Sequence, residues 1–406
     1  MSGGSDRVLT RPFVFLWLAT FFHFASFFLL MPVIPLYVQG MRASAAEVGI
    51  AVAAFTVSSL SLRPFIGKLV DRTGRRRFLI AGTIVFAVMA PLYGLAHSVL
   101  AVVLVRVIHG SGMALFTTAS LTVATDLAPP HRRGQALAWF AMANSLAIGI
   151  GPALGAFLWE AGGTWAAFGA AAALSALGFT MAISVAVPPH QTHADDGPRR
   201  LRLVHPAAVA PALLIFSLAL TYGCSTAFVS LFVKDRHLGN AGWFFMAYSA
   251  AILTLRPFAG ALSDQRGRRY VLMPGLACAG LAVCGIGFAQ TVPALLLLAA
   301  AYGLGVGAAQ STVIALTMDR VGTHGRGLGA ATFLSALELG LALGASGSGL
   351  LLDATNTNYT VLFAVVGLAP LVGSVATRWV KEGELLAAPP AQEADQIESA
   401  VVITGE

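Results

Sequence analysis

Long apolar segments follow one another along almost the whole chain, with short polar stretches between them. Of its 406 residues, 57% are hydrophobic and only 11% are charged, whereas a soluble protein carries about 25% charged residues. A helix needs about 20 apolar residues to cross a bilayer, and these segments are long enough to do so. Lipid offers no partner to an unpaired backbone group, and no strand alternation is visible, so the spans must be helices. We therefore predict an all-α membrane protein.

We expect twelve transmembrane helices, the first of them retained. The polar start at 1–11 precedes an apolar segment that is too long for a signal-peptide core. An even number of spans puts both termini on one side of the membrane. The predicted helices cover residues 12–37, 46–66, 78–97, 99–124, 135–158, 164–187, 207–233, 242–262, 271–290, 292–318, 328–352 and 358–380.

The charge distribution predicts the orientation of the chain. The net charge is +7, but the positive residues form no stripe of the kind that binds nucleic acid. Most lysines and arginines outside the spans fall on the side of the termini, and only Arg42, Lys234 and Arg236 fall on the opposite side. Cytoplasmic loops carry such an excess of positive charge. We expect a multi-pass protein of the cell (inner) membrane with both termini in the cytoplasm.

The chain repeats itself at an offset of 193 residues. The stretch 63–77, which begins Arg-Pro-Phe, returns at 256–269, and the matches continue beyond it: Gly110 with Gly303, Asp126 with Asp319, His131 with His324, and Gly134 with Gly327. Parallel repeats of this kind are typical of one transporter architecture, in which the substrate binds between the two halves. We predict two pseudo-symmetric six-helix bundles at 1–187 and 207–382, a cytoplasmic linker at 188–206 and a disordered acidic tail at 383–406.

Four sequence motifs resemble those of a known family. Residues 67–76, Gly-Lys-Leu-Val-Asp-Arg-Thr-Gly-Arg-Arg, are similar to the loop 2–3 signature of the major facilitator superfamily. Residues 106–112 resemble its fourth-helix arginine motif, and residues 147–155 resemble a motif of its exporters. Residues 31–35 are similar to the end of helix 1 in its twelve-span drug:proton antiporters.

The resemblance implies that the repeated loop is a latch between the halves that favours one access state. The residues that would carry this role are Gly67, Asp71, Arg72, Gly74 and Arg75, with Asp264, Gly267 and Arg268 in the second copy. The second copy lacks Lys68 and Arg72 of the first, so we expect it to be the weaker latch. The alternative is that the arginines only anchor the loop at the anionic inner leaflet.

The span at 135–158 holds the exporter-type motif. Its Gly151, Pro152 and Gly155 leave a smooth face and a bend, which suits a helix that rocks against its neighbours. Ordinary tight packing would explain the same residues.

An arginine inside a span needs a partner or a water-filled cavity, because its insertion costs about 3 kcal/mol. We expect Arg106 to face a cavity, although its side chain could instead reach the membrane interface. The resemblance implies a role for Arg106 in proton coupling. His109 stands where the family usually has Gln, and it could titrate near neutral pH or bond between helices.

Glu338 is the acidic residue that we place deep within a span. It aligns with Ser145 in the first half, so the carboxylate is not part of the repeated scaffold. A carboxyl group at such a position can carry a proton or, when neutral, bond across helices. His23 lies in the first span, where exporters of this family often carry an acid, and Asn144 could contact substrate or another helix.

We expect a secondary active transporter that exports a small amphipathic or apolar compound by proton antiport with alternating access, and not an enzyme. The partners are then a small-molecule substrate, protons and the lipid bilayer, without nucleic acid, and we expect a monomer. No metal-ligand spacing or nucleotide motif is present, so no cofactor or metal is predicted. A proton-coupled importer of a sugar or organic acid, and a membrane sensor that does not transport, are the alternatives.

Overall fold

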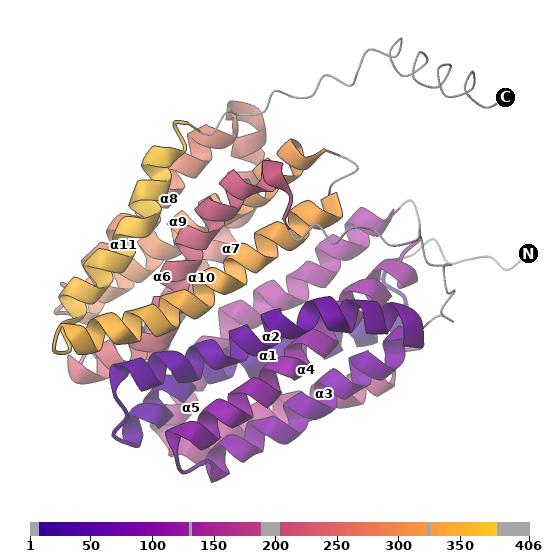
Figure 1. The fold of residues 1–406 in the computed structure, drawn as a ribbon, viewed down its shortest axis with the longest axis horizontal. Coiled ribbons are helices and arrows are strands. Elements are labelled where there is room, and N and C mark those ends of the chain that lie inside the picture. Colours follow the sequence, from indigo (N-terminus) through magenta and orange to yellow (C-terminus); the bar gives the residue numbers. More distant parts are fainter. Residues whose placement is uncertain (1–7, 130–131, 188–203, 323–325, 380–406) are drawn as a thin grey trace, which may run out of the picture.

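The computed structural model describes residues 8–129, 132–187, 204–322 and 326–379, and this part of the chain is helical throughout (Figure 1). The first half holds α1 (Arg11–Gly40), α2 (Ala45–Thr73), α3 (Arg75–Leu92), α4 (Val99–Leu127) and α5 (Arg133–Ile183). The second half holds α6 (Val209–Asp235), α7 (Ala241–Arg266), α8 (Arg268–Ile286), α9 (Val292–Val321), α10 (Arg326–Ala354) and α11 (Tyr359–Ala376). Short 3₁₀ turns at Tyr93–Leu95 and Pro206–Ala208 precede α4 and α6.

The helix α5 contains two membrane spans. It is 51 residues long, and its backbone leaves the helical region at Gly163, where φ is 64° and ψ is −153°. A left-handed φ of this kind favours glycine, which has no Cβ to clash. The predicted gap between the spans at 135–158 and 164–187 is therefore a sharp break at Gly163. Among the described residues, ten helices are long and apolar enough to cross a membrane, or eleven if the bent α7 is one span, and dividing α5 at Gly163 brings this number to the twelve that the sequence predicts.

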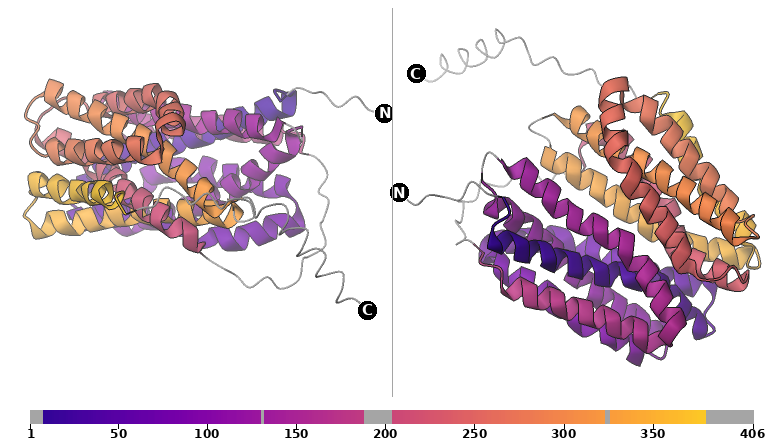
Figure 2. Two further views of the ribbon diagram at one scale, coloured as in Figure 1. Left: turned by 90° about the horizontal axis from the view of Figure 1, so that it is seen from above. Right: turned by 180° about the vertical axis from the view of Figure 1, so that it is seen from behind.

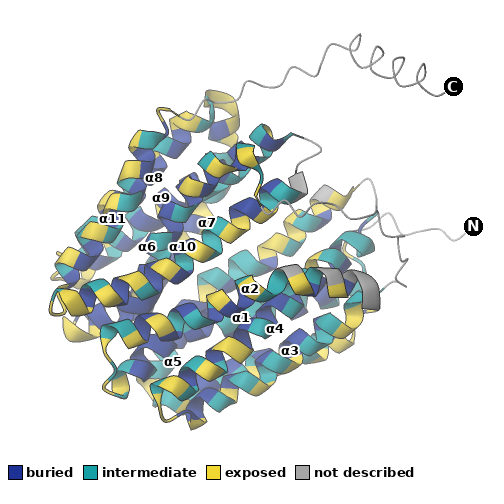
Figure 3. Cartoon of the chain, in the orientation of Figure 1, coloured by how far each residue is buried: buried dark blue, intermediate teal, exposed yellow. Residues whose placement is uncertain are grey.

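The two halves lie side by side as separate helical bundles (Figures 1 and 2). They approach each other at one end and diverge toward the other, which is the end where α1 begins and α11 ends. We call this second end the terminal end and the first the opposite end. Large apolar side chains such as Leu100, Leu297 and Val372 are exposed, and exposed residues alternate with buried ones along the helices (Figure 3). Exposed apolar side chains of this kind suit helices that are surrounded by lipid.

Matching contacts show that the sequence repeat is also a structural repeat. Arg75 forms an ion pair with Asp126 in the first half, and Arg268 forms one with Asp319 in the second, at 2.8 Å. Close helix contacts repeat in the same way. A Cβ on Gly110 would meet the Phe55 carbonyl, and a Cβ on Gly303 would meet that of Tyr248. Small residues at these crossings let the backbones touch, as is common in membrane bundles.

Two of the predicted segments fall largely or wholly outside the described residues. They are the linker at 188–206, of which 204–206 are described, and the acidic tail at 383–406. The exact boundaries of the two bundles stay predictions.

Candidate functional site

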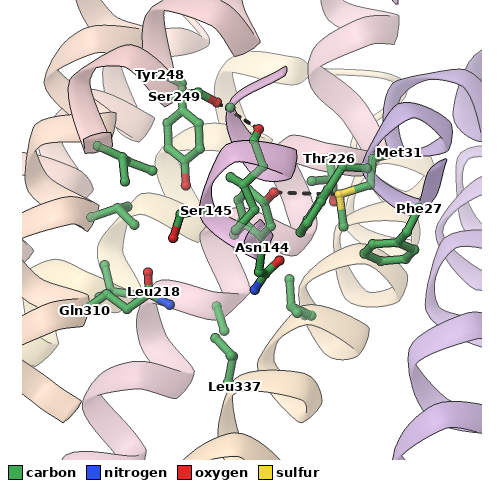
Figure 4. A pocket seen from close by; sticks show the side chains of 18 of the residues that line it. Phe27, Met31, Asn144, Ser145, Leu218, Thr226, Tyr248, Ser249, Gln310 and Leu337 are labelled. Carbon is green, nitrogen blue, oxygen red and sulfur yellow. Dashed lines mark hydrogen bonds between the residues drawn. The ribbon is translucent and has the colours of Figure 1, made fainter. Parts of the chain in front are cut away.

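A cavity of about 210 Å³ lies between the two halves (Figure 4). Phe27 and Met31 of the first half lie on one side of it, and Tyr248 and Gln310 of the second half lie on the other. The helices α1, α2, α4 and α5 face α6, α7, α9 and α10 across it. The lining residues from the first half are Phe27, Phe28, Met31, Val52, Thr56, Arg106, Asn144, Ser145, Ile148 and Gly149. Those from the second half are Ile215, Leu218, Ala219, Tyr222, Thr226, Tyr248, Ser249, Ile252, Leu253, Arg256, Val306, Gln310, Leu337 and Leu341.

Arg106 reaches the cavity from α4 but is bound to its own half. Its side chain is 4% exposed, and its Nε and Nη2 donate to the Ala51 and Val52 carbonyls of α2 at 3.1 and 3.0 Å. The guanidinium also lies 4.7 Å from the centroid of the Phe55 ring, a cation–π contact. These contacts hold the charge inside the bundle, so the side chain does not reach for the membrane interface.

Arg256 and Ser145 meet across the halves at the edge of the cavity. Arg256 of α7 donates from Nη1 to the Ser145 hydroxyl of α5 at 3.2 Å. Asn144 also lines the cavity, and its Oδ1 is buried without a hydrogen-bond partner in the described part of the chain. A buried polar atom left unpaired costs about 1–3 kcal/mol, so a ligand that supplied a donor there would recover this energy.

Arg63 and Glu338 form an ion pair across the other face of the interface, between α2 and α10. Their side chains are 27% and 12% exposed, so the pair is largely withdrawn from water. Leu337, next to Glu338, and Leu341, three residues after it, line the cavity. The pair at 63 and 338 is the repeat counterpart of the pair at 256 and 145, because both members are offset by 193 residues.

A second pair of links joins the halves at the opposite end. The Asp353 carboxylate of α10 accepts hydrogen bonds from the Ala45 and Ala46 amides, both at 2.9 Å, and so caps α2. Its repeat counterpart is Glu160, which bonds to Asn240, the N-cap residue of α7. The first amides of a helix have no partner within the helix, and they favour negative charge. Carboxylates of one half therefore satisfy or support the helix starts of the other half.

The two histidines lie inside the first bundle and do not line the cavity. His23 is stacked between Phe86 and Phe116, with ring centroids at 3.7 and 3.9 Å, and neither of its ring nitrogens has a partner among the described residues. His109 shares a hydrogen bond of 2.9 Å between its Nδ1 and the Tyr93 hydroxyl. Its other ring nitrogen is unpaired in the same part of the structure.

The described latch residues contact their own halves in this structure. Arg75 pairs with Asp126, and Arg268 pairs with both Asp264 and Asp319. The turns at Gly74 and Gly267 have φ of 93° and 91°, which explains why both positions are glycine. A Cβ on Gly67 would meet nothing within 4 Å. The side chains of Asp71 and Arg72 lie outside the described part, so the latch stays a prediction.

The motif in α5 makes a close contact with α1. A Cβ on Gly155 would overlap the Leu29 carbonyl, and one on Gly151 would lie 2.6 Å from the Phe28 Cβ. Pro152 lies between them in the helix. Because Phe28 also lines the cavity, this contact fixes part of its wall.

Sequence analysis missed several residues that join the halves: Arg63, Ser145, Glu160, Asp353 and Arg256. Arg63 and Arg256 open the two copies of the repeated stretch and lie within the predicted spans at 46–66 and 242–262, but no role is predicted for them from the sequence. The repeat alignment carried the missing signal, because it matches Arg63 with Arg256 and Ser145 with Glu338. Among the described residues, no group of three or more His, Cys, Asp and Glu side chains is placed to hold a metal ion.

Two pseudo-symmetric bundles of apolar helices around a shared cavity define a multi-pass membrane protein of the transporter class. The sequence matches the family profile of the Major Facilitator Superfamily over residues 16–239 and 211–403. The chain belongs to this superfamily of transporters.

Drug-efflux proteins are among its relatives. The chain is 24% identical over 233 residues to quinolone resistance protein NorA of Staphylococcus aureus, a match that covers 56% of this chain and 60% of the relative. It is 31% identical over 146 residues to multidrug resistance protein 2 of Bacillus subtilis, covering 36% of each. The chain thus spans less than two thirds of the length of these relatives.

Solved structures share the fold. A bacterial homologue of the human lysosomal transporter Spinster, in an inward-facing and unoccupied conformation, superposes with a TM-score of 0.69 at 17% identity, covering 92% of this chain and 95% of that one. A peptide transporter POT superposes with a TM-score of 0.73 at 14% identity, covering 93% and 96%. Identities this low show the fold alone.

Proposed function

We propose that the protein exports a small amphipathic or apolar compound across the cell membrane in exchange for protons. The observation that carries this proposal is the Arg63–Glu338 ion pair, which joins the two halves beside their shared cavity. A titratable group at such a place can connect its protonation to the arrangement of the halves. The relatives support export, because two of them are named for resistance to quinolones or to multiple drugs.

The orientation follows from the basic residues at the terminal end. Arginines such as Arg76, Arg77 and Arg133 lie at this end, whereas Arg42, Lys234 and Arg236 lie at the other. The positive-inside rule then places the terminal end, and with it both chain termini, in the cytoplasm. In this orientation the inter-half links of Asp353 and Glu160 lie on the outer side. We therefore assign the structure to a state that is held shut toward the outside.

Alternating access requires that the links at the two ends are made in turn. In the present state four helices are joined on the outer side: Asp353 of α10 binds the start of α2, and Glu160 of α5 binds Asn240 at the start of α7. Breaking these contacts and bringing the cytoplasmic ends together would turn the cavity to the outside. The latch loops, whose described arginines now pair within their own halves, would join the halves in that second state.

Protonation of Glu338 would bias this exchange between states. It removes one charge of the ion pair, so it changes the free energy of any arrangement that contains the pair relative to one that lacks it. A proton that enters with a net charge of +1 gains about 2.3 kcal/mol per 100 mV. Among the described residues, the Glu338 carboxylate forms its ion pair with Arg63.

The test uses purified protein in proteoliposomes with an imposed pH gradient. We expect drug-like substrates to move against the direction of the proton flux, and an uncoupler to abolish the movement. Flux that is indifferent to the uncoupler would remove the proton from the mechanism. Flux in the same direction as the protons would instead indicate an importer.

A further inference from the structure

We infer that the central cavity selects amphipathic organic anions, with Arg256 as the residue that binds the anionic group. This inference rests on the proposed function, because it names the chemical class of the exported compound. It is carried by the charges of the cavity wall, by the hydrogen bonds that these charges already make, and by the apolar surface that surrounds them.

The charged residues that line the cavity are both arginines. Arg106 and Arg256 belong to its wall, and the described residues that line it include no Asp or Glu. The nearest acid in sequence to the wall, Glu338 beside Leu337, is already paired with Arg63. Within the described part of the chain the cavity therefore carries uncompensated positive charge.

The two arginines differ in how far they are already bound. Arg106 is held by the Ala51 and Val52 carbonyls and by the Phe55 ring. Arg256 makes its described hydrogen bond to Ser145, a neutral hydroxyl that uses one of the five donors of a guanidinium. No carboxylate pairs with Arg256 among the described residues. It is therefore the cation with donors to offer to a ligand.

The pseudo-symmetry makes this contrast sharper. At the matching position of the other half, Arg63 has a carboxylate partner, Glu338, whereas the described partner of Arg256 is the neutral hydroxyl of Ser145. A ligand carboxylate or sulfonate placed against Arg256 would give the second arginine the same kind of partner that the first one has. Charge-assisted hydrogen bonds of this type are about twice as strong as neutral ones.

The rest of the wall suits the apolar body of such a ligand. Phe27, Phe28 and Met31 supply aromatic and thioether surface, and Tyr222 and Tyr248 face them from the second half. The cavity volume of about 210 Å³ suits a compact molecule of one or two rings better than a long acyl chain. A lipophilic cation would find the same apolar surface but would be repelled by both arginines.

The test measures binding to the purified full-length protein with three probes of one shape: 2-naphthoate, 2-naphthamide and 2-naphthylmethylammonium. We expect the anion to bind at least about tenfold more tightly than the amide, and the cation to bind most weakly. Arg256→Gln should remove the preference for the anion, and Arg256→Lys should keep part of it. Arg266→Gln, on the same helix but outside the cavity, should leave the preference unchanged.

Lysophosphatidylglycerol distinguishes a lipid anion from a small organic one. We expect the lysolipid to displace little of the bound naphthoate. Tighter binding of the lysolipid that still depends on Arg256 would support an anionic ligand but contradict the claim that the ligand is compact. Equal binding of anion, amide and cation, or an anion preference that survives Arg256→Gln, would overturn the inference.

The same probes in proteoliposomes separate this inference from the proposed function. Uncoupler-sensitive transport of the ammonium probe, with naphthoate ignored, would contradict the anion selectivity and leave the proton-coupled exporter standing. Arg256-dependent binding of naphthoate without any transport would contradict the exporter and leave the anion site standing.

Discussion

Ser145 and Glu338 occupy the same position in the two halves, and each contacts an arginine of the opposite half at the same repeat position. One contact is a neutral hydrogen bond beside the cavity, and the other is an ion pair. The repeat thus provides one scaffold with two different chemistries. We interpret the ion pair as the place of proton coupling and the neutral contact as the place where an anionic substrate binds.

Glu338→Gln should uncouple transport from the pH gradient. The substitution keeps the shape of the side chain but fixes it in a neutral form, so the protonation state no longer changes the inter-half contact. We expect loss of gradient-driven accumulation with retained binding of substrate, measured in proteoliposomes and in detergent. Glu47→Gln is the matched control, because Gln also completes the capping box at the start of α2. Unchanged accumulation in Glu338→Gln would refute the coupling role.

Ser145→Glu should give Arg256 a carboxylate partner of its own. The new side chain stands where Glu338 stands in the other half, so it would occupy the donors that we assign to the ligand. We expect the affinity for naphthoate to fall by about tenfold or more. The affinity for the ammonium probe should rise relative to that for naphthoate. Ser145→Gln, similar in size but neutral, is the control. Equal loss in both variants would point to a steric effect and against a charge effect.

Asp353→Ala should loosen the end of the interface that is now shut. It leaves the Ala45 and Ala46 amides without their partner, a loss of about 0.5–2 kcal/mol for a helix cap. The state open at that end should gain roughly fivefold in population for a shift of about 1 kcal/mol.

The measurement for this variant is the labelling rate of Thr226→Cys, a cavity position, by an impermeant maleimide in right-side-out vesicles. The native Cys224, Cys278 and Cys284 are first replaced by Ala. Asp235→Ala is the control, because Asp235 accepts a hydrogen bond from Tyr359 within its own half at the same end. Faster labelling in the control than in Asp353→Ala would contradict the assignment.

Gly155→Ala should destabilise the contact between α1 and α5. Its Cβ would overlap the Leu29 carbonyl, and overpacking of this kind costs about 1–3 kcal/mol. We expect a lower Tm and weaker substrate binding, because Phe28 on the same stretch of α1 lines the cavity. Gly169→Ala is the control on the same helix, where an added Cβ meets nothing within 4 Å. Equal Tm values for the two variants would show that α1 moves away at no cost.

The fold was predictable because a bilayer permits few solutions. Apolar length sets the spans, and the 193-residue repeat sets the two bundles. The break at Gly163 shows the limit of this reasoning. Sequence predicts a gap between two spans there, but only the backbone shows a single left-handed residue joining two helices.

The site was predictable only in part, because lipid-facing and cavity-facing residues are both apolar. Asn144 and Arg106 are polar residues within predicted spans, and both line the cavity. His23 is also a polar residue within a predicted span, yet it packs between two phenylalanines inside the first bundle. Arg63 and Arg256 lie just before the basic loop in each half, and their sequence position alone does not show that they contact the other half. Which face of a helix looks inward depends on its rotation, which hydropathy does not report here.

The central claim is that the two halves move against each other around the cavity, and a reversible crosslink across the shut end tests it most directly. Lys234 Nζ lies 3.2 Å from Gln39 Oε1, with one residue from each half. In protein without the native cysteines, Gln39→Cys with Lys234→Cys would be joined by a short bis-methanethiosulfonate linker. The single-cysteine variants serve as controls. We predict that crosslinked protein binds substrate but stops transporting, and that reduction restores transport. Transport at the unlinked rate by fully crosslinked protein would contradict the account.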